Sequence, residues 1–236
     1  MEEIKNKVRE TNPFEDSEIA EQWIKSVEGE KGLIRDKEIY PMLREWANSI
    51  GTGFIVEIGS GQGICSQQLA EFSGNYIGVE PSEILTKRAK ELYSDNEHLS
   101  FVVGNAYELP VSDASADGIF SVNVWFHLAD LAEASKELSR VLKTGSKFNI
   151  ITTNPDSYDV WKEFFEDYSV EGKLLIGKVN VPINPMSRND FYMHTMEEMT
   201  VAFKNCGLEI ESIKALGTMS KHPEKPIFVS IQGFKI

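Results

Sequence analysis

Cysteine is scarce in this chain of 236 residues, which contains only two, Cys65 and Cys206. Each lies in an apolar helical pattern, so we expect buried free thiols rather than a disulfide, and with them a reducing, cytoplasmic location. The four histidines are dispersed along the chain, and the two cysteines lack the spacing of zinc ligands. The sequence therefore predicts no metal site.

Long apolar runs and basic clusters are also missing. No apolar run approaches the roughly 20 residues that span a bilayer, and the charged start of the chain, Met1-Glu2-Glu3-Ile4-Lys5, is unlike a signal peptide. The net charge is −13, and the basic residues are scattered rather than clustered. Because nucleic-acid binders neutralise phosphates with grouped Lys and Arg, we expect no nucleic acid and no membrane among the partners. The oligomeric state is left open.

The dominant pattern is an alternation of short apolar runs with helical stripes. It predicts an α/β fold with a mostly parallel sheet and helices on both faces. The expected strands cover residues 54–58, 76–79, 99–103, 118–124 and 147–152, and two closing strands cover 208–216 and 227–231.

Three further segments surround this core. Residues 1–50 are predicted to be a helical extension, with Ser17 as a helix N-cap. Residues 154–194 are predicted to be an insert after the fifth strand, with an aromatic-faced helix through Trp161 and Tyr168, then an irregular stretch at 179–185. Residues 195–236 are predicted to add a final helix, with a capping box at Thr195, and the closing strands. We expect a single domain whose cofactor-binding core is 51–153.

A glycine-rich turn follows the first expected strand, in Val56-Glu57-Ile58-Gly59-Ser60-Gly61-Gln62-Gly63. Glu80 follows the next strand, about one βα unit later, which suits a nucleoside cofactor with its ribose on the carboxylate. A dinucleotide fingerprint would need glycine or alanine where Ile64 stands, and this departure argues against NAD.

Several sequence blocks in order resemble the class I S-adenosylmethionine-dependent methyltransferases, over roughly residues 50–235. Besides the glycine turn, the blocks are Gly78-Val79-Glu80-Pro81-Ser82, Gly104-Asn105-Ala106-Tyr107-Glu108-Leu109-Pro110, Ala116-Asp117-Gly118-Ile119-Phe120-Ser121, Phe126-His127-Leu128 and Leu138-Ser139-Arg140-Val141-Leu142-Lys143-Thr144-Gly145. The family often has Asp at the place of Asn105, whose amide oxygen can still accept a hydrogen bond.

The resemblance implies a Rossmann-like sheet of seven strands, S-adenosyl-L-methionine as cofactor, and a set of binding residues. Glu57 and the glycine turn would hold the methionine end, and Glu80 would accept hydrogen bonds from the ribose. Asn105 and Ala106 would flank adenine, while Ser121 and Val122 would border the methionyl group. The expected cofactor site comprises Glu57, Gly59, Ser60, Gly61, Gly63, Glu80, Pro81, Asn105, Ala106, Ser121 and Val122.

Catalysis and acceptor binding have weaker signals. A general base is needed only if the acceptor has a proton to lose, and the catalytic candidates are His127, His194 and Tyr192, with Asp190 a further possible base. A role as a partly buried histidine at a helix start competes for His127, a structural cap role competes for His194, and Asp190 is most simply a solvated loop acid. Tyr158, Trp161 and Phe165 could line an acceptor pocket, although aromatic stripes at helical spacing commonly pack a core.

The leading hypothesis is an enzyme that transfers a methyl group by direct displacement to a small-molecule acceptor. A cofactor-binding regulatory or scaffold protein without activity is the alternative, and an NAD-linked oxidoreductase is a minor one.

Overall fold

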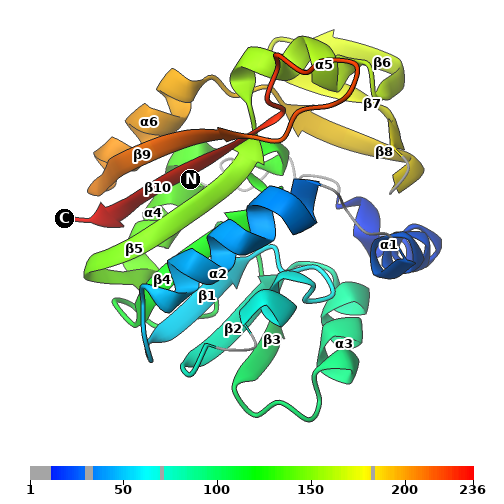
Figure 1. Cartoon of the computed structure of the whole chain (residues 1–236). Coiled ribbons are helices and arrows are strands. Elements are labelled where there is room, and N and C mark those ends of the chain that lie inside the picture. The colour runs from blue at the N-terminus through cyan, green and yellow to red at the C-terminus, as the bar shows by residue number, and fades with distance from the viewer. Residues whose placement is uncertain (1–11, 30–33, 70–71, 182–183) are drawn as a thin grey trace, which may run out of the picture.

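A computed structural model describes residues 12–29, 34–69, 72–181 and 184–236 of the chain. Within them, seven strands form the main sheet in the order β3-β2-β1-β4-β5-β10-β9 (Figure 1). The strands are β1 Phe54–Ile58, β2 Asn75–Glu80, β3 Leu99–Val103, β4 Ala116–Val122, β5 Leu142–Thr153, β9 Leu208–Leu216 and β10 Phe228–Lys235.

The helices precede, connect and follow these strands. The α-helices are α1 Ser17–Gly29, α2 Tyr40–Asn48, α3 Glu83–Leu92, α4 Leu131–Val141, α5 Tyr158–Lys162 and α6 Met196–Asn205, and the short helical turns are η1 Pro13–Glu15, η2 Arg35–Ile39, η3 Cys65–Leu69, η4 Trp125–His127 and η5 Pro155–Ser157. The helical pattern around Cys65 predicts a helix after the glycine turn, whereas the described residues there form the 3₁₀ turn η3.

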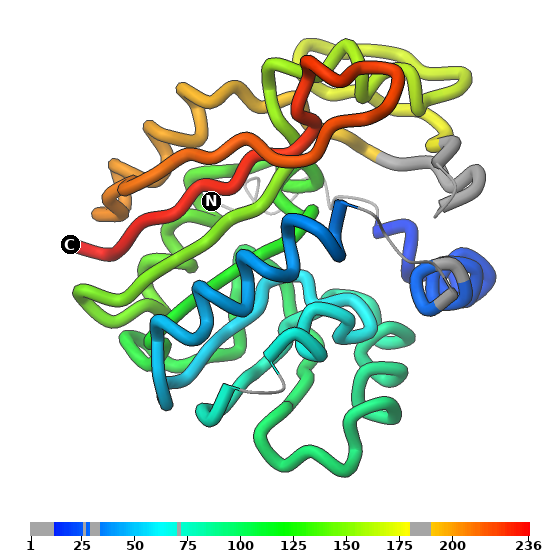
Figure 2. Tube along the Cα trace, viewed as in Figure 1, coloured from blue at the N-terminus to red at the C-terminus, as the bar shows by residue number. Residues whose placement is uncertain are grey.

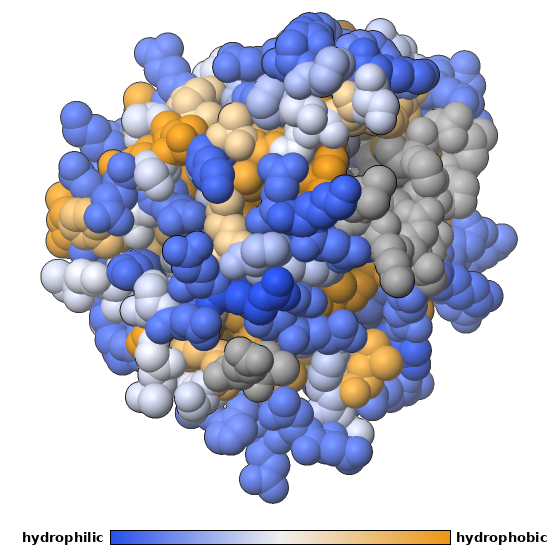
Figure 3. All heavy atoms as spheres, viewed as in Figure 1, coloured by the Kyte–Doolittle hydropathy of each residue, from blue (hydrophilic) through white to orange (hydrophobic). Residues whose placement is uncertain are grey.

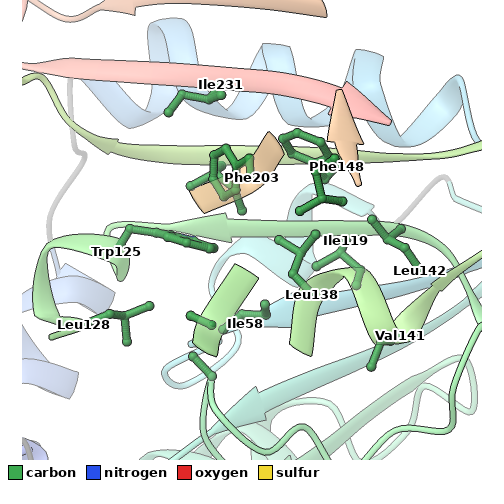
Figure 4. Packing of buried hydrophobic residues seen from close by; sticks show 14 of the residues in the cluster. Ile58, Ile119, Trp125, Leu128, Leu138, Val141, Leu142, Phe148, Phe203 and Ile231 are labelled. Atoms are coloured by element: carbon green, nitrogen blue, oxygen red, sulfur yellow. The ribbon is translucent and has the colours of Figure 1, made fainter. Parts of the chain in front are cut away.

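The sheet separates two hydrophobic clusters because successive side chains of a buried strand point to opposite faces. Val56 and Ile58 of β1 pack on one face against α4 and α6, in the cluster that includes Leu138 and Phe203 (Figure 4). Ile55 packs on the other face with Trp46 of α2. Helices on both faces of a largely parallel sheet confirm the predicted fold class.

Strand direction brings the expected site residues to one edge. β1 pairs in parallel with β2 and β4, β2 with β3, and β4 with β5. Only β10 is antiparallel to its neighbours β5 and β9. Segments that follow β1, β2, β3 and β4 therefore meet at the carboxyl edge of the sheet, where open α/β folds bind ligands.

A second sheet lies in the chain between β5 and α6, where the insert was predicted. It has the order β6-β7-β8, with β6 Phe165–Glu171, β7 Leu174–Val181 and β8 Asn184–Tyr192. Figure 1 shows it over one end of the main sheet, and β8 packs against η4, which directly follows β4. This second sheet, called the cap below, therefore covers the carboxyl edge.

Two predictions for the insert are wrong. The aromatic-faced helix ends at Lys162, and from Phe165 the chain is a strand paired with β7. The stretch expected to be irregular is strand on both sides of residues 182–183, which lie outside the described residues. Aromatic and β-branched residues also favour strands, so their helical spacing alone does not distinguish a helix from a strand. Here pairing with β7 satisfies the backbone hydrogen bonds of the segment and makes it a strand.

Helix α1 lies beside both the cap and α3, as Figures 1 and 2 show. The backbone amides of Glu18 and Ile19, in its first turn, donate to the carboxylate of Asp16. The helix N-cap is therefore Asp16, one residue earlier than the predicted Ser17. Arg88 of α3 donates two hydrogen bonds to Glu28, which ties the end of α1 to α3.

Hydrophilic residues dominate the face of the molecule seen in Figure 3, with smaller hydrophobic patches between them. Among the residues that the structure describes, no helix combines the length and the apolar character needed to cross a membrane.

Candidate cofactor and acceptor site

The glycine turn crosses the end of β2. The backbone amides of Gly59 and Ser60 both donate to the Val79 carbonyl, at 2.8 and 3.2 Å. Gly59, Gly61 and Gly63 all have positive φ, which a residue with a side chain adopts at a cost. A short apolar strand followed by three such glycines therefore produces a turn that lies flat against its neighbouring strand.

The three glycines meet different surroundings. A Cβ on Gly59 would lie 2.2 Å from Cγ2 of Val124, and one on Gly63 would lie 2.8 Å from the ring of Phe101. A Cβ on Gly61 would meet nothing within 4 Å. Gly59 and Gly63 are thus required for packing inside the protein, whereas Gly61 leaves open space into which a ligand can approach the backbone.

Glu80 lies at the end of β2, beside Gly61. Its Oε2 accepts a hydrogen bond from the Gly61 amide and its Oε1 accepts one from the Ser82 amide, each at 3.0 Å. Burial raises the pKa of Glu80 to about 7, against the lowering effect of these two amides. Because a carboxylate has about four acceptor positions, two remain for a ligand. Pro81, next to it, is exposed.

Glu57 lies on the β1 face that packs against α2, and it is 1 % exposed. The hydroxyl of Tyr76 donates to its Oε2. Burial raises the pKa of Glu57 to about 8, opposed by hydrogen bonds from Tyr76 and Cys65 and reinforced by the negative charge of Glu80. Burial therefore keeps Glu57 largely protonated at pH 7, and a cationic ligand near these strand ends would favour the ionised forms of Glu57 and Glu80.

Among the buried polar atoms that have no hydrogen-bond partner in the described residues, three lie in the glycine turn and directly after β4. They are Ser60 Oγ and Gln62 Nε2, which follow β1, and Asn123 Oδ1, which follows β4. Asn123 also has a φ of 60°, an unfavourable conformation that surrounding structure must stabilise. Unpaired buried donors and acceptors are costly, so this edge is suited to a polar ligand with groups of both kinds.

The expected adenine segment follows β3. Asn105 is exposed, and its Oδ1 accepts hydrogen bonds from the amides of Tyr107 and Glu108 at 2.8 and 3.0 Å. This oxygen, which we expected to face the ligand, thus stabilises the local turn. Ala106 is buried against the larger hydrophobic cluster.

A residue that the sequence analysis did not assign to the site holds this segment in place. Arg140 of α4 donates to the carbonyls of Leu109 and Val111, and it pairs with Glu137 and Asp113. Hydrogen bonds from Arg140 hold the pKa of Glu137 below its usual range. Arg140 was part of a quoted family block, but nothing in its spacing indicated these partners.

The residues at the end of β4 show a packing role. Ser121 is fully buried, and its hydroxyl donates to the Ile58 carbonyl at 2.9 Å, which joins β4 to β1. Val122 is partly buried against the α2 cluster. Val124, which no sequence signal singled out, closes against Gly59.

His127 lies at the end of η4, where it meets the cap. Its Nδ1 is 3.1 Å from the Asp190 carbonyl of β8. Burial lowers the pKa of His127 to about 4, although Asp190 acts in the opposite direction, so the imidazole is neutral at pH 7. Because a backbone carbonyl can only accept a hydrogen bond, this contact requires the proton of the neutral ring to be on Nδ1.

His194 and Tyr192 lie near the junction of β8 and α6. His194 is 2 % exposed, and its Nε2 donates to the Leu128 carbonyl at 2.6 Å. Tyr192 stacks on the His194 ring, with centroids 5.8 Å apart. The two histidines therefore make complementary contacts, His127 to the cap and His194 to the residue that follows His127.

The three expected acceptor-pocket residues do come together around Phe191 of β8. The Tyr158, Trp161 and Phe165 rings lie with centroids 5.8, 5.9 and 5.6 Å from that of Phe191. Phe126 of η4 stacks on Phe191 at 4.9 Å. This aromatic cluster thus joins α5, the cap and the segment that contains His127.

No group of three or more side chains suited to a metal ion is found among the described residues.

Part of the chain matches a known family model. Residues 56–150 match the family model described as "Methyltransferase domain". O-methyltransferase resE of Aspergillus sclerotiorum is 29 % identical over 123 residues, which are 48 % of this chain and 47 % of that protein. Sterol 24-C-methyltransferase erg6 of Aspergillus fumigatus is 26 % identical over 162 residues, or 66 % of this chain and 40 % of that protein. The chain thus spans about half the length of these curated relatives, or less.

Solved structures share the fold. The PH0226 protein of Pyrococcus horikoshii OT3 superposes with a TM-score of 0.70 at 18 % identity, covering 86 % of this chain and 90 % of that one. At this identity the likeness establishes the arrangement of helices and strands alone.

Proposed function

We propose that this class I S-adenosylmethionine-dependent methyltransferase transfers a methyl group by direct displacement to a small, partly apolar acceptor. The observation that carries the proposal is the pairing of Gly61 with Glu80. The turn donates an amide to a buried carboxylate beside open space, next to unpaired polar atoms. That is the environment a nucleoside with an amino-acid tail requires.

The residues present fit S-adenosylmethionine, which supplies an activated methyl group on a positively charged sulfur when bound. We assign the ribose hydroxyls to the two remaining acceptor positions of Glu80. The unpaired Gln62 amide and Ser60 hydroxyl are available to the polar methionine end. In their ionised forms, which the positive charge of this ligand would favour, Glu57 and Glu80 would stabilise that charge.

We assign the other cofactor contacts by position in the sheet. Asn105 and Ala106 follow β3, where adenine would lie, and Arg140 positions their segment. Ser121 and Val122 end β4 next to the glycine turn, where the methionyl chain would pass. Pro81 would cover the outer side of the ribose.

For methyl transfer, the protein mainly has to align a nucleophile with the methyl carbon and to exclude water. The cap and its aromatic cluster cover the carboxyl edge, and we assign the acceptor to the space between this cluster and the glycine turn. Aromatic walls favour an acceptor with apolar surface. The two relatives described above are named as an O-methyltransferase and a sterol methyltransferase, which supports a small-molecule acceptor.

Isothermal titration with S-adenosylhomocysteine, followed by an assay for its release from S-adenosylmethionine with a panel of small acceptors, tests the proposal. We expect micromolar or tighter binding and turnover with at least one acceptor. Absence of binding would reject the cofactor site. Binding without turnover on any acceptor would instead support a regulatory or scaffold protein.

A further inference from the structure

The first described segment of the chain, residues 12–29, connects the two sides of the carboxyl edge and is called the strap below. Its turn η1 and its helix α1 both contact α3 on one side and β8 of the cap on the other. Figure 1 shows α1 between these two elements, and the trace in Figure 2 follows the same path. Because α3 follows Glu80 and β8 carries Phe191, the strap extends from the side assigned to the cofactor to the side assigned to the acceptor.

Ser82 attaches the strap next to the carboxylate assigned to the ribose. This serine is fully buried, and its Oγ donates a hydrogen bond to the Phe14 carbonyl of the strap at 2.7 Å. The same Oγ accepts from the Leu85 amide, as the N-cap of α3, and the Ser82 amide donates to Glu80 Oε1 at 3.0 Å. One residue therefore contacts the strap, the start of α3 and the carboxylate of Glu80.

Few other contacts hold the strap. Arg88 of α3 donates two hydrogen bonds to Glu28, but their side chains are 34 % and 33 % exposed, and ion pairs of this kind contribute little. No strap residue belongs to any of the three hydrophobic clusters of the described chain. Ala20 and Val27 are buried, whereas the other described side chains of the strap are partly or fully exposed. An element with so few buried contacts opens at a lower free-energy cost than the core.

The groups assigned to the cofactor are almost inaccessible with the strap in this position. Gln62 is 1 % exposed, and Ser60 and Glu80 are each 6 % exposed. A nucleoside with an amino-acid tail has to reach all three, so part of the cover over the carboxyl edge must move to admit it. The cap has a hydrophobic cluster of its own, whereas the strap belongs to none, so the strap is the part that moves at the lower cost.

Asn12 offers a hydrogen-bond donor from the strap. Its Oδ1 accepts from the Phe14 amide at 3.0 Å, which makes Asn12 the N-cap of η1, while its Nδ2 is buried without a hydrogen-bond partner among the described residues. A buried amide donor without a partner is costly, and an acceptor atom of a ligand can offset that cost. Because the strap brings this donor to the site only when closed, a ligand that binds it favours the closed state.

We propose that Asn12 is a further cofactor-binding residue, whose Nδ2 donates to an acceptor atom of the adenosine part, and that Ser82 is the positioning residue that holds the strap closed for this contact. The inference rests on the proposed function and deepens it. The adenosine part is the closer one, because Phe14, two residues after Asn12, is bound to Ser82 beside Glu80. The strap opens to admit the cofactor and to release the product, and its closure excludes water.

Two substitutions separate the donor from the attachment. Asn12→Asp keeps an oxygen that accepts from the Phe14 amide but removes the donor. Ser82→Gly removes the hydroxyl that holds the Phe14 carbonyl, and because glycine is itself a tolerated helix N-cap, the start of α3 is largely kept. Ser17→Ala, at an exposed position of the strap, is the matched control.

Hydrogen–deuterium exchange of the full chain, with and without S-adenosylhomocysteine, measures closure of the strap. Titration calorimetry and stopped-flow dissociation measure affinity and release. In wild type, S-adenosylhomocysteine should slow exchange of the strap amides by about tenfold or more, together with those of the glycine turn. Asn12→Asp should lower affinity by about fivefold. Ser82→Gly should speed release by about tenfold and remove protection of the strap while the glycine turn stays protected. Ser17→Ala should behave as wild type.

Strap amides that exchange equally with and without bound S-adenosylhomocysteine would overturn the inference. Unchanged affinity in Asn12→Asp would remove Asn12 from the site. An unchanged release rate in Ser82→Gly, or loss of protection in the strap and the glycine turn together, would reject the positioning role of Ser82. Failure of wild type to bind S-adenosylhomocysteine would reject the proposed function and this inference with it, whereas binding that leaves the strap unprotected would reject the inference alone.

Discussion

Val124 occupies the space that a side chain on Gly59 would need: its Cγ2 lies 2.2 Å from the position of a Cβ on that glycine. The contact joins the turn after β1 to the segment after β4, on which Phe126 and His127 lie. This van der Waals contact therefore links the shape of the cofactor turn to the placement of the segment that holds Phe126 and His127.

The glycine pair Gly59 and Gly61 gives a first prediction. Gly59→Ala should destabilise the protein by about 3 kcal/mol, because it combines overpacking against Val124 with a positive φ. Gly61→Ala has the φ cost alone, about 1 kcal/mol, but its methyl group enters the open space beside Glu80 and should weaken S-adenosylhomocysteine binding. Urea denaturation and calorimetric titration measure the two effects. A larger loss of stability for Gly61→Ala would contradict the packing described.

Glu80 is the subject of the second prediction. Glu80→Ala should weaken S-adenosylhomocysteine at least tenfold, which is about 1.4 kcal/mol, because it removes the ribose acceptor and releases the amides of Gly61 and Ser82. The exposed Glu83, three residues later, supplies the control Glu83→Gln, which should bind as wild type. Unchanged affinity in Glu80→Ala, measured by titration calorimetry, would remove this residue from the site.

The raised pKa of Glu57 predicts how stability depends on pH. Folding raises this pKa from 4.5 to about 8, so the folded protein binds a proton that the unfolded chain has lost. The contribution is complete below about pH 4.5 and is lost as pH rises through 8, with a slope of at most about 1.4 kcal/mol per pH unit. Thermal unfolding between pH 5 and 8, in the absence of cofactor, should show this decline.

Glu57→Gln isolates that contribution, since Gln is neutral at every pH and can still accept a hydrogen bond from Tyr76. The variant should lose less stability than wild type between pH 5 and 8. Because Glu80, with a pKa near 7, acts in the same direction, some decline should persist. Parallel curves for the two proteins would show that Glu57 is ionised in the folded state throughout this range.

Asn105 gives a fourth prediction, on the segment after β3. Asn105→Asp keeps the oxygen that accepts from Tyr107 and Glu108, and it introduces the residue often found in the family, so affinity for S-adenosylhomocysteine should stay within about threefold. Asn105→Ala removes both hydrogen bonds and should cost about 1–2 kcal/mol of stability. If the alanine variant lost affinity without losing stability, the side chain would contact the ligand rather than the turn.

The aromatic cluster gives the fifth prediction. Phe191 is 3 % exposed and contacts four aromatic rings, so Phe191→Ala should cost about 3–5 kcal/mol. Tyr168 of β6, in the same small sheet, is 46 % exposed, and Tyr168→Ala should cost no more than about 0.5 kcal/mol. Chemical denaturation followed by tryptophan fluorescence compares them. Similar costs would mean that the cap does not depend on this cluster.

Predictions from the sequence were correct where the local residue pattern and the tertiary structure favour the same element. The bounds of β1 and β3 match the predicted strands, because short apolar runs bounded by glycine and polar residues have few alternatives. The capping box at Thr195 is present as predicted, since its hydrogen bonds form within four residues. The glycine turn and Glu80 come together because parallel strands place consecutive loops at one edge.

They failed where partners distant in sequence decide the structure. The aromatic spacing from Trp161 to Tyr168 fits a helix, yet pairing of Phe165 with Val179 makes this segment a strand. The two amides that donate to the Asn105 oxygen could not be foreseen from the sequence, and the role of Asn105 at adenine stays a prediction. The assignment of individual residues to cofactor, acceptor and catalysis stays a prediction, as does the division of the chain into an extension, core, insert and closing segment.

The sequence by itself determined the α/β fold, the order of the main-sheet strands along the chain and the expected type of cofactor. Hydrophobic periodicity, glycine positions and family blocks are patterns among residues close in sequence. They can therefore be recognised without the tertiary structure. Only the tertiary structure decided that Val124 closes on Gly59, that Arg140 holds the segment after β3, and that the Asp190 carbonyl orients His127. These contacts join residues far apart in the chain, and two of them involve backbone carbonyls, which every residue has and no sequence pattern distinguishes.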